Sequence, residues 1–169
     1  YRGGRFSEGA TRGDGSRGED ITSNLRTIRA LPLVVEGAVP PAFEVRGEVY
    51  MPRPEFERLN AERAATGEQL YMNPRNTAAG SVRQLDPSMT ASRRLALLAY
   101  QLGWVEGGAT PAESQWGALE WLRASGFPTS PHARRFDTVE EVEAFCAEWA
   151  QRRDSLEYDI DGVVVKVDE

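Results

Sequence analysis

Charged side chains that could bind or transfer phosphate occur in several separate segments of this sequence. The first segment is residues 11–20, where glycines alternate with charged residues and where Arg12 and Arg17 lie. Glycine leaves backbone N–H groups unobstructed, and a helix is expected to begin directly afterwards, so the segment has the features of a phosphate-binding loop. A solvated loop with turn glycines is the alternative interpretation.

A second candidate is Glu48, within a segment of alternating residue types at 43–50. The period of two places Val45, Gly47 and Val49 on one face of a strand and Glu48 on the opposite, charged face. There Glu48 could accept hydrogen bonds from a ribose or orient a hydrated metal ion. Alternatively, Arg46 and Glu48 only form exposed pairs with residues of a neighbouring strand, which contribute little to stability.

The end of the chain contains a third group of candidates, Asp159, Asp161 and Lys166, which is the only lysine present. The run DIDGVV resembles the aspartate-nucleophile motif of haloacid dehalogenase phosphatases, but only five residues follow Val164, whereas that family needs further catalytic groups far downstream. A turn that enters a strand explains the same residues. Asp161 and Lys166 are five apart, so they serve one site only if Asp161 precedes the regular strand or Gly162 forms a bulge.

Periodicity and capping signals predict the elements that must position these groups. Apolar spacing, N-cap residues and stop signals predict helices, and alternating or β-branched runs predict strands. Residues 71–88 show no apolar periodicity. The expected helices are 20–28, 52–67, 110–126 and 138–149, and the expected strands are 43–50, 95–105 and 159–167. Because these elements do not alternate as regular βαβ units, we expect an α+β fold with antiparallel sheets flanked by helices.

Composition excludes several classes of protein. A chain of 169 residues fits a single domain spanning 1–169. The net charge of −6 argues against holding duplex nucleic acid by general phosphate neutralisation. A single cysteine, Cys146, excludes a disulfide scaffold and a cysteine zinc cluster. No apolar run predicts a membrane span, and the start has neither an initiator Met nor a signal peptide, so we expect a piece of a longer, cytoplasmic protein.

Taken in order, the charged motifs resemble the adenylation domain of bacterial NAD-dependent DNA ligases. The resemblance covers nearly the whole chain and is weakest at 103–150. It rests on TRGDG at residues 11–15, GEDITSN at 18–24, VRGEV at 45–49, NPRNTAAGSVRQLD at 73–86 and DIDGVVVK at 159–166. It implies a nucleotidyltransferase core like that of DNA ligases and mRNA capping enzymes.

The resemblance also implies an activity. Such ligases seal nicks between a 5′-phosphate and a 3′-hydroxyl in duplex DNA through enzyme–AMP and DNA–adenylate intermediates, with NAD as adenylate donor and with magnesium. The implied partners are nicked duplex DNA and NAD or AMP, with no membrane and no oligomer.

The family's site residues match individual positions here. By resemblance, Arg12, Glu48 and Lys166 contact the adenylate nucleotide, and Lys166 also supports catalysis. Four further positions match residues important for nucleotidyl transfer or for the DNA end: Arg75, Arg83, Arg153 and Asp161. The metal ligands stay unassigned. The family's nucleophilic lysine lies in a Lys-x-Asp-Gly motif that these residues lack, so we expect them to be inactive alone and to supply a wall of the nucleotide pocket.

Two other functional classes compete with this interpretation. A phosphatase of the haloacid dehalogenase type would use Asp159 as its nucleophile. A non-catalytic structural or adhesion module would use the tripeptide Arg12-Gly13-Asp14, which is the integrin-type adhesion motif.

Overall fold

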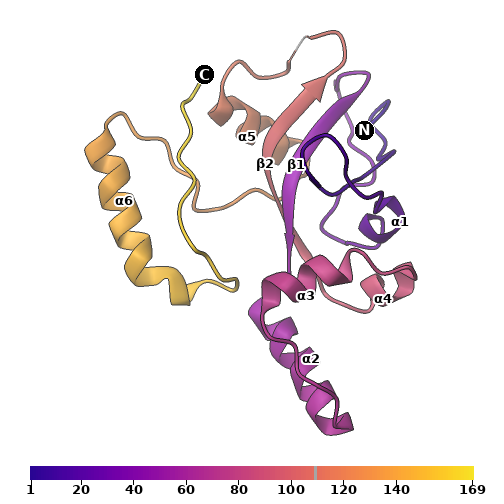
Figure 1. The fold of residues 1–169 in the computed structure, drawn as a ribbon. Coiled ribbons are helices and arrows are strands. Elements are labelled where there is room, and N and C mark those ends of the chain that lie inside the picture. Colours follow the sequence, from indigo (N-terminus) through magenta and orange to yellow (C-terminus); the bar gives the residue numbers. More distant parts are fainter. Residues whose placement is uncertain (109) are drawn as a thin grey trace.

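Two long antiparallel strands form the central ribbon of the fold, with helices around it (Figure 1). The structure is a computed structural model that describes residues 1–108 and 110–169. Strand β1 (Phe43–Tyr50) pairs with β2 (Ala96–Val105), and the pairs include Glu48 with Leu98 and Gly47 with Ala99. The α+β class is thus confirmed. The prediction of several sheets is wrong for the described residues, in which these strands form a single two-stranded sheet.

One face of the ribbon is buried, as the alternating pattern of 43–50 predicts. Phe43 and Ala99 point into a core that also contains Leu122 and Phe127, each no more than 2% exposed. Helix α5 (Gln115–Ala124) supplies Leu122 and covers this face. The opposite face carries Glu48 together with other polar and aromatic side chains.

A second core lies where α1 (Thr22–Leu25) meets the two short helices α3 (Pro74–Ser81) and α4 (Pro87–Ala91). Its buried residues are Ile21, Ile28, Met51, Ala78, Val82 and Leu95. The sequence did not indicate α3 or α4, because their apolar residues are few. Each helix instead begins with a proline that follows a capping side chain. Asn73 accepts the backbone N–H of Asn76, and Asp86 accepts that of Ser88.

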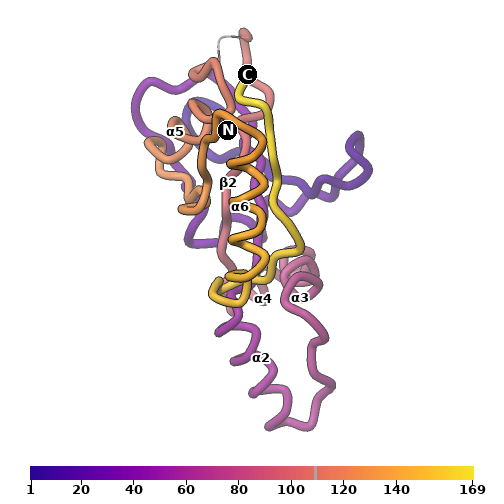
Figure 2. The backbone as a smooth tube through the Cα atoms, turned by 90° about the vertical axis from the view of Figure 1, so that its left-hand side faces the viewer, coloured from indigo at the N-terminus to yellow at the C-terminus, as the bar shows by residue number. Residues whose placement is uncertain are grey.

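The longer helices follow their capping signals with one exception. Helix α2 (Arg53–Thr66) ends at Gly67, whose φ of 71° is left-handed, and it projects away from the ribbon (Figures 1 and 2). Helix α6 (Val139–Arg152) has the predicted capping box at Thr138. Helix α5 begins later than predicted, since the Thr110 hydroxyl donates to Ala112 O within a local turn and Ser114 provides the cap. No helix in the described part of the chain is long and apolar enough to cross a membrane.

The prediction of a strand at 159–167 is wrong. After α6 and the short 3-10 helix η1 (Arg153–Ser155), the chain runs in irregular, exposed conformation along the ribbon, where Figures 1 and 2 show it in yellow. Valine-rich sequence favours extended backbone, but a strand also needs a partner edge. Isolated contacts hold this segment instead. The backbone N–H of Arg53 donates to Glu157 O at 2.6 Å, Tyr158 packs on Tyr50, and Asp168 accepts the Trp116 N–H at 2.7 Å.

A buried carboxylate connects α2 to the start of β2. The side chain of Glu55, 3% exposed, accepts two hydrogen bonds from the Arg58 guanidinium, at 2.8 and 2.7 Å, and the backbone N–H of Arg94 at 3.0 Å. Arg58 above all lowers the pKa of the Glu55 carboxyl.

We expect Glu55→Gln to lower the free energy of unfolding at pH 7 by about 1.5–3 kcal/mol, since hydrogen bonds to a charged group are lost. A carboxyl whose pKa is lower in the folded than in the unfolded state stabilises the folded protein at pH values above its unfolded-state pKa. This stabilisation is lost as pH falls through the folded-state pKa. The deficit of the variant should therefore shrink in acid, which urea unfolding at several pH values measures. Glu57→Gln, an exposed change on the same helix, is the control; a deficit that does not depend on pH would contradict the assignment.

Candidate functional site

The glycine-rich segment at 11–20 is a hairpin that closes on itself. Its base is held by the Thr11 N–H, which donates to Glu19 O at 3.0 Å, and by the Glu19 N–H, which donates to Thr11 Oγ1 at 3.0 Å. At the tip, Asp14 Oδ1 accepts the N–H groups of Ser16 and Arg17, which lower the pKa of the Asp14 carboxyl. These amides are used within the loop, so the prediction that they form a free phosphate cradle is wrong for them.

Two glycines make this closure possible. A Cβ at Gly13 would lie 1.7 Å from Arg17 O, and a Cβ at Gly18 would lie 1.9 Å from Thr11 O. Arg12 is an exposed residue of this hairpin. No hydrogen bond or ion pair within 1–108 and 110–169 joins its side chain to Glu48 or Lys166.

Glu48 and Lys166 lie over the same outer face of the ribbon. Glu48 pairs with Leu98, so their side chains share a face. Further along β2, Tyr100 lies at a bulge between the Gly47–Ala99 and Arg46–Gln101 pairs. Its side chain lies near that of Arg46, which is on the same face of β1 as Glu48. The Lys166 ammonium lies 5.2 Å from the centre of the Tyr100 ring. Tyr158 packs on Tyr50 at 4.9 Å, next to Glu48 on the same face. Glu48 therefore lies between two contacts that hold the C-terminal segment over the ribbon.

The remaining C-terminal candidates lie around the turn that follows α6. Asp161 Oδ2 is 3.9 Å from Arg75 Nη1, which connects this segment to α3. Arg153 lines a cavity of about 270 Å³ together with Arg53 and Asp159, whose side chains form an ion pair at 2.9 Å. Sequence reasoning missed Arg53. Its position at the first turn of a polar helix gives no sign of this long-range contact.

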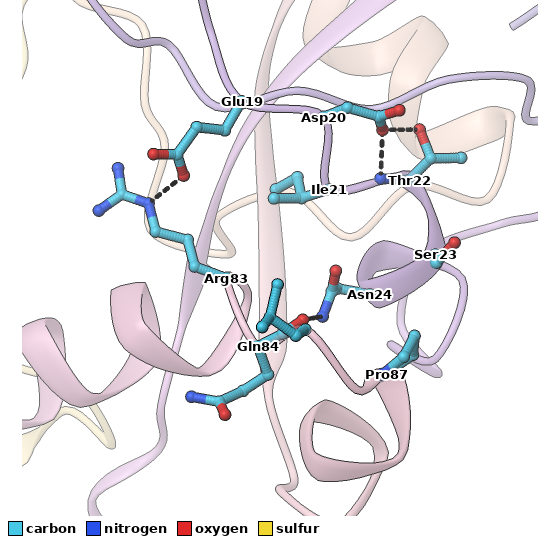
Figure 3. Close-up of a pocket in the computed structure, with 10 residues that line it drawn as sticks. Glu19, Asp20, Ile21, Thr22, Ser23, Asn24, Arg83, Gln84 and Pro87 are labelled. Atoms are coloured by element: carbon cyan, nitrogen blue, oxygen red, sulfur yellow. Dashed lines mark hydrogen bonds and ion pairs between the residues drawn. The ribbon is translucent and has the colours of Figure 1, made fainter.

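Arg83 lies at a larger cavity of about 690 Å³ between α1, the hairpin and the turn before α4 (Figure 3). Its side chain forms an ion pair with Glu19, in which Nε lies 2.9 Å from Oε2. Among the described residues, no group accepts a hydrogen bond from either terminal nitrogen of Arg83, so both can bind an anion such as phosphate. Sequence reasoning did not single out Glu19 or Asn24, although both lie in the GEDITSN motif.

The structure therefore brings four of the seven candidates together, in two pairs. Glu48 and Lys166 share the outer face, and Arg75 contacts Asp161. Arg12, Arg83 and Arg153 lie on other segments. Within 1–108 and 110–169, no three His, Cys, Asp or Glu side chains gather as they would around a metal ion. What this arrangement provides is a polar, aromatic sheet face and separate guanidinium groups, which suit a ligand that carries phosphates.

Comparison with known proteins identifies the family of this chain. The family model for the NAD-dependent DNA ligase adenylation domain matches residues 1–169. A protein named DNA ligase from Dehalococcoides mccartyi is 53% identical over 168 residues, which cover 99% of this chain and 25% of the relative. Proteins named DNA ligase from Chloroflexus aurantiacus and Bacillus cytotoxicus are each 49% identical to this chain. Both alignments include 100% of this chain and 25% of the relative.

This chain belongs to the NAD-dependent DNA ligase adenylation domain family. It spans about a quarter of the length of the curated relatives that it matches. The resemblance inferred from the order of the motifs is thereby confirmed.

The competing interpretations are not supported. Asp159 does not follow a buried strand, as a phosphatase nucleophile of the haloacid dehalogenase type would. It lies in an exposed turn, paired with Arg53. In the Arg12-Gly13-Asp14 tripeptide, the Asp14 carboxylate is occupied by hydrogen bonds from its own hairpin.

Proposed function

We propose that residues 1–169 form one nucleotidyltransferase unit of an NAD-dependent DNA ligase. The enzyme seals a 5′-phosphate to a 3′-hydroxyl at a nick in duplex DNA, with NAD as the adenylate donor, and works as a monomer in the bacterial cytoplasm in DNA replication and repair. The family match and the relatives named DNA ligase support this proposal.

The geometric observation that supports the proposal best is the shared outer face of Glu48 and Lys166. A carboxylate there can accept hydrogen bonds from ribose hydroxyls, and an ammonium can neutralise phosphate charge. We assign both residues to the adenylate, together with Arg12, which the hairpin presents on a rigid but separate element. The nucleophilic lysine is not assigned to this chain, because Lys166 is its only lysine and matches a supporting position.

Four further residues are assigned to nucleotidyl transfer or to the DNA end: Arg75, Arg83, Arg153 and Asp161. Phosphoryl transfer depends on positioning and on stabilising charge as it develops, which guanidinium forks do well. Glu48 and Asp161 are assigned as outer acceptors for hydrated magnesium. Because the described residues form no cage of three or more ligands, the ion would depend on water and on phosphate oxygens for most of its coordination.

The full-length protein, incubated with magnesium and a nicked duplex, should seal the nick with NAD and release nicotinamide mononucleotide. Replacing NAD by ATP should abolish sealing. Denaturing gel electrophoresis of an end-labelled strand measures the product. A duplex that lacks the 5′-phosphate is the control, because it offers no acceptor for the adenylate. Sealing with ATP but not with NAD, or no sealing at all, would refute the proposed function.

A further inference from the structure

A buried polar network lies directly beneath the turn that carries Arg83. The side-chain amide of Asn24, on α1, donates to Gln84 O and to Thr90 Oγ1, each at 2.8 Å. Thr90 Oγ1 in turn donates to Ser81 O at 2.7 Å. Asn24, Thr90 and Ser81 are 7%, 1% and 0% exposed. Buried polar groups that are fully paired fix one backbone arrangement, since breaking them leaves an unsatisfied group.

This network fixes the backbone on both sides of Arg83. Ser81 lies two residues before Arg83, and Gln84 directly follows Arg83. The backbone carbonyl of each accepts one hydrogen bond of the network. Asn24 and Thr90 therefore hold the α3–α4 turn onto α1 at the two carbonyls that flank the arginine. Arg83 itself is half exposed, so buried contacts of its own do not determine where its Cα lies.

A second anchor acts on the side chain of Arg83. Glu19 contacts Nε, the inner nitrogen of the guanidinium, and leaves the two outer nitrogens directed away from the carboxylate (Figure 3). The backbone of Glu19 is held in turn by both hydrogen bonds at the hairpin base. An exposed ion pair of this kind adds little to the stability of the fold. We therefore attribute to it the orientation of the Arg83 guanidinium.

We propose that Asn24 and Glu19 are positioning residues for Arg83: Asn24 places the backbone of its turn and Glu19 orients its guanidinium toward a phosphate of the nicked DNA. This inference rests on the proposed function, which assigns Arg83 to the DNA end. Neither residue touches the reacting atoms. Both act through the arginine, and their effects should therefore disappear when the arginine is removed.

The test compares two steps in the full-length enzyme. We expect Asn24→Ala to slow AMP transfer from pre-adenylated enzyme to the nick by about ten- to a hundredfold, because a displaced charge-assisted contact is lost. Self-adenylation with NAD should keep its rate. Single-turnover assays measure both. Ser92→Ala, which removes an exposed hydroxyl bond at the end of α4, is the matched control and should change neither step.

A double-mutant cycle separates positioning from a general structural role. Asn24→Ala added to Arg83→Ala should slow the nick step no further. Additive losses, or an equal loss in both steps with a lower melting temperature, would overturn the proposal. Normal nick kinetics in Arg83→Ala alone would instead refute the assignment of Arg83 under the proposed function, so the two failures are distinguishable.

Two further variants cover the case in which Asn24→Ala does not fold. Thr90→Val keeps the shape of the side chain, removes the hydroxyl that joins Asn24 to Ser81, and should reproduce the selective loss in the nick step. Glu19→Ala should also slow only that step, and Glu19→Gln, which keeps an acceptor for Nε, should restore most of the rate. If Glu19→Gln is as slow as Glu19→Ala, or if Thr90→Val leaves the nick step unchanged, the positioning roles are wrong.

Discussion

Replacing Glu48 by alanine should slow self-adenylation of the full-length enzyme by about ten- to a hundredfold, which corresponds to the loss of roughly 1.5–3 kcal/mol of charge-assisted hydrogen bonding. The carboxylate lies on the outer face of β1, between the Tyr50–Tyr158 and Tyr100–Lys166 contacts. Because it lies on an exposed face, its removal should not unfold the ribbon. The rate at which radiolabelled AMP from NAD becomes attached to the protein measures the effect.

Glu44→Ala is the matched control for this experiment. Glu44 is another exposed glutamate of β1, and its ion pair with Arg46, at 2.5 Å, is also at the surface. An exposed pair contributes at most about 1 kcal/mol to stability, so the Glu44 variant should adenylate normally. If Glu48→Ala adenylates at the wild-type rate, or if both variants slow equally, the sheet face does not bind the nucleotide.

Phe43→Ala should lower the free energy of unfolding by about 3–5 kcal/mol. Phe43 is 2% exposed, and its ring stacks on Tyr1 at 5.0 Å and meets Trp121 edge-on at 5.3 Å. Alanine would leave a cavity between β1 and α5 that these rigid aromatic neighbours cannot fill. Urea unfolding of the 169-residue chain, followed by tryptophan fluorescence and circular dichroism, measures the loss.

Trp104→Ala is the control for size and aromatic character. Trp104 lies on β2 but is 57% exposed, so its removal should change stability by no more than about 0.5 kcal/mol. A small loss in Phe43→Ala, similar to that in Trp104→Ala, would mean that the face of β1 assigned to the core is not tightly packed.

The sequence predicted those elements whose own residues determine their structure. Alternation predicted β1, and the capping box at Thr138 predicted the start of α6. The helices α3 and α4 were missed because helix caps and tertiary contacts, rather than an apolar stripe, stabilise them. The strand expected at 159–167 was wrong, since β-propensity does not specify a neighbour to pair with.

The sequence predicts a set of candidate site residues but not how they are arranged. The motif order indicated Glu48 and Lys166 as candidates. Their common position over the ribbon follows only from the structure, in which β1 carries Glu48 and Lys166 contacts Tyr100 of β2. The expectation that Asp161 and Lys166 would point to opposite sides assumed a regular strand, and it does not apply to the irregular segment observed. Asn24 was missed because nothing in the sequence distinguishes a buried asparagine from an exposed one. Its partners at residues 84 and 90 are distant in sequence.

The irregular path of the last residues has a consequence for motion. Residues 161–167 lie along the ribbon without joining its ladder, so their peptide groups face water rather than a partner strand. This strip can lift and settle by exchanging side-chain contacts alone, at far lower cost than peeling away a paired strand. Lys166 would move with the strip, so its ammonium would change position relative to Glu48 on the ribbon.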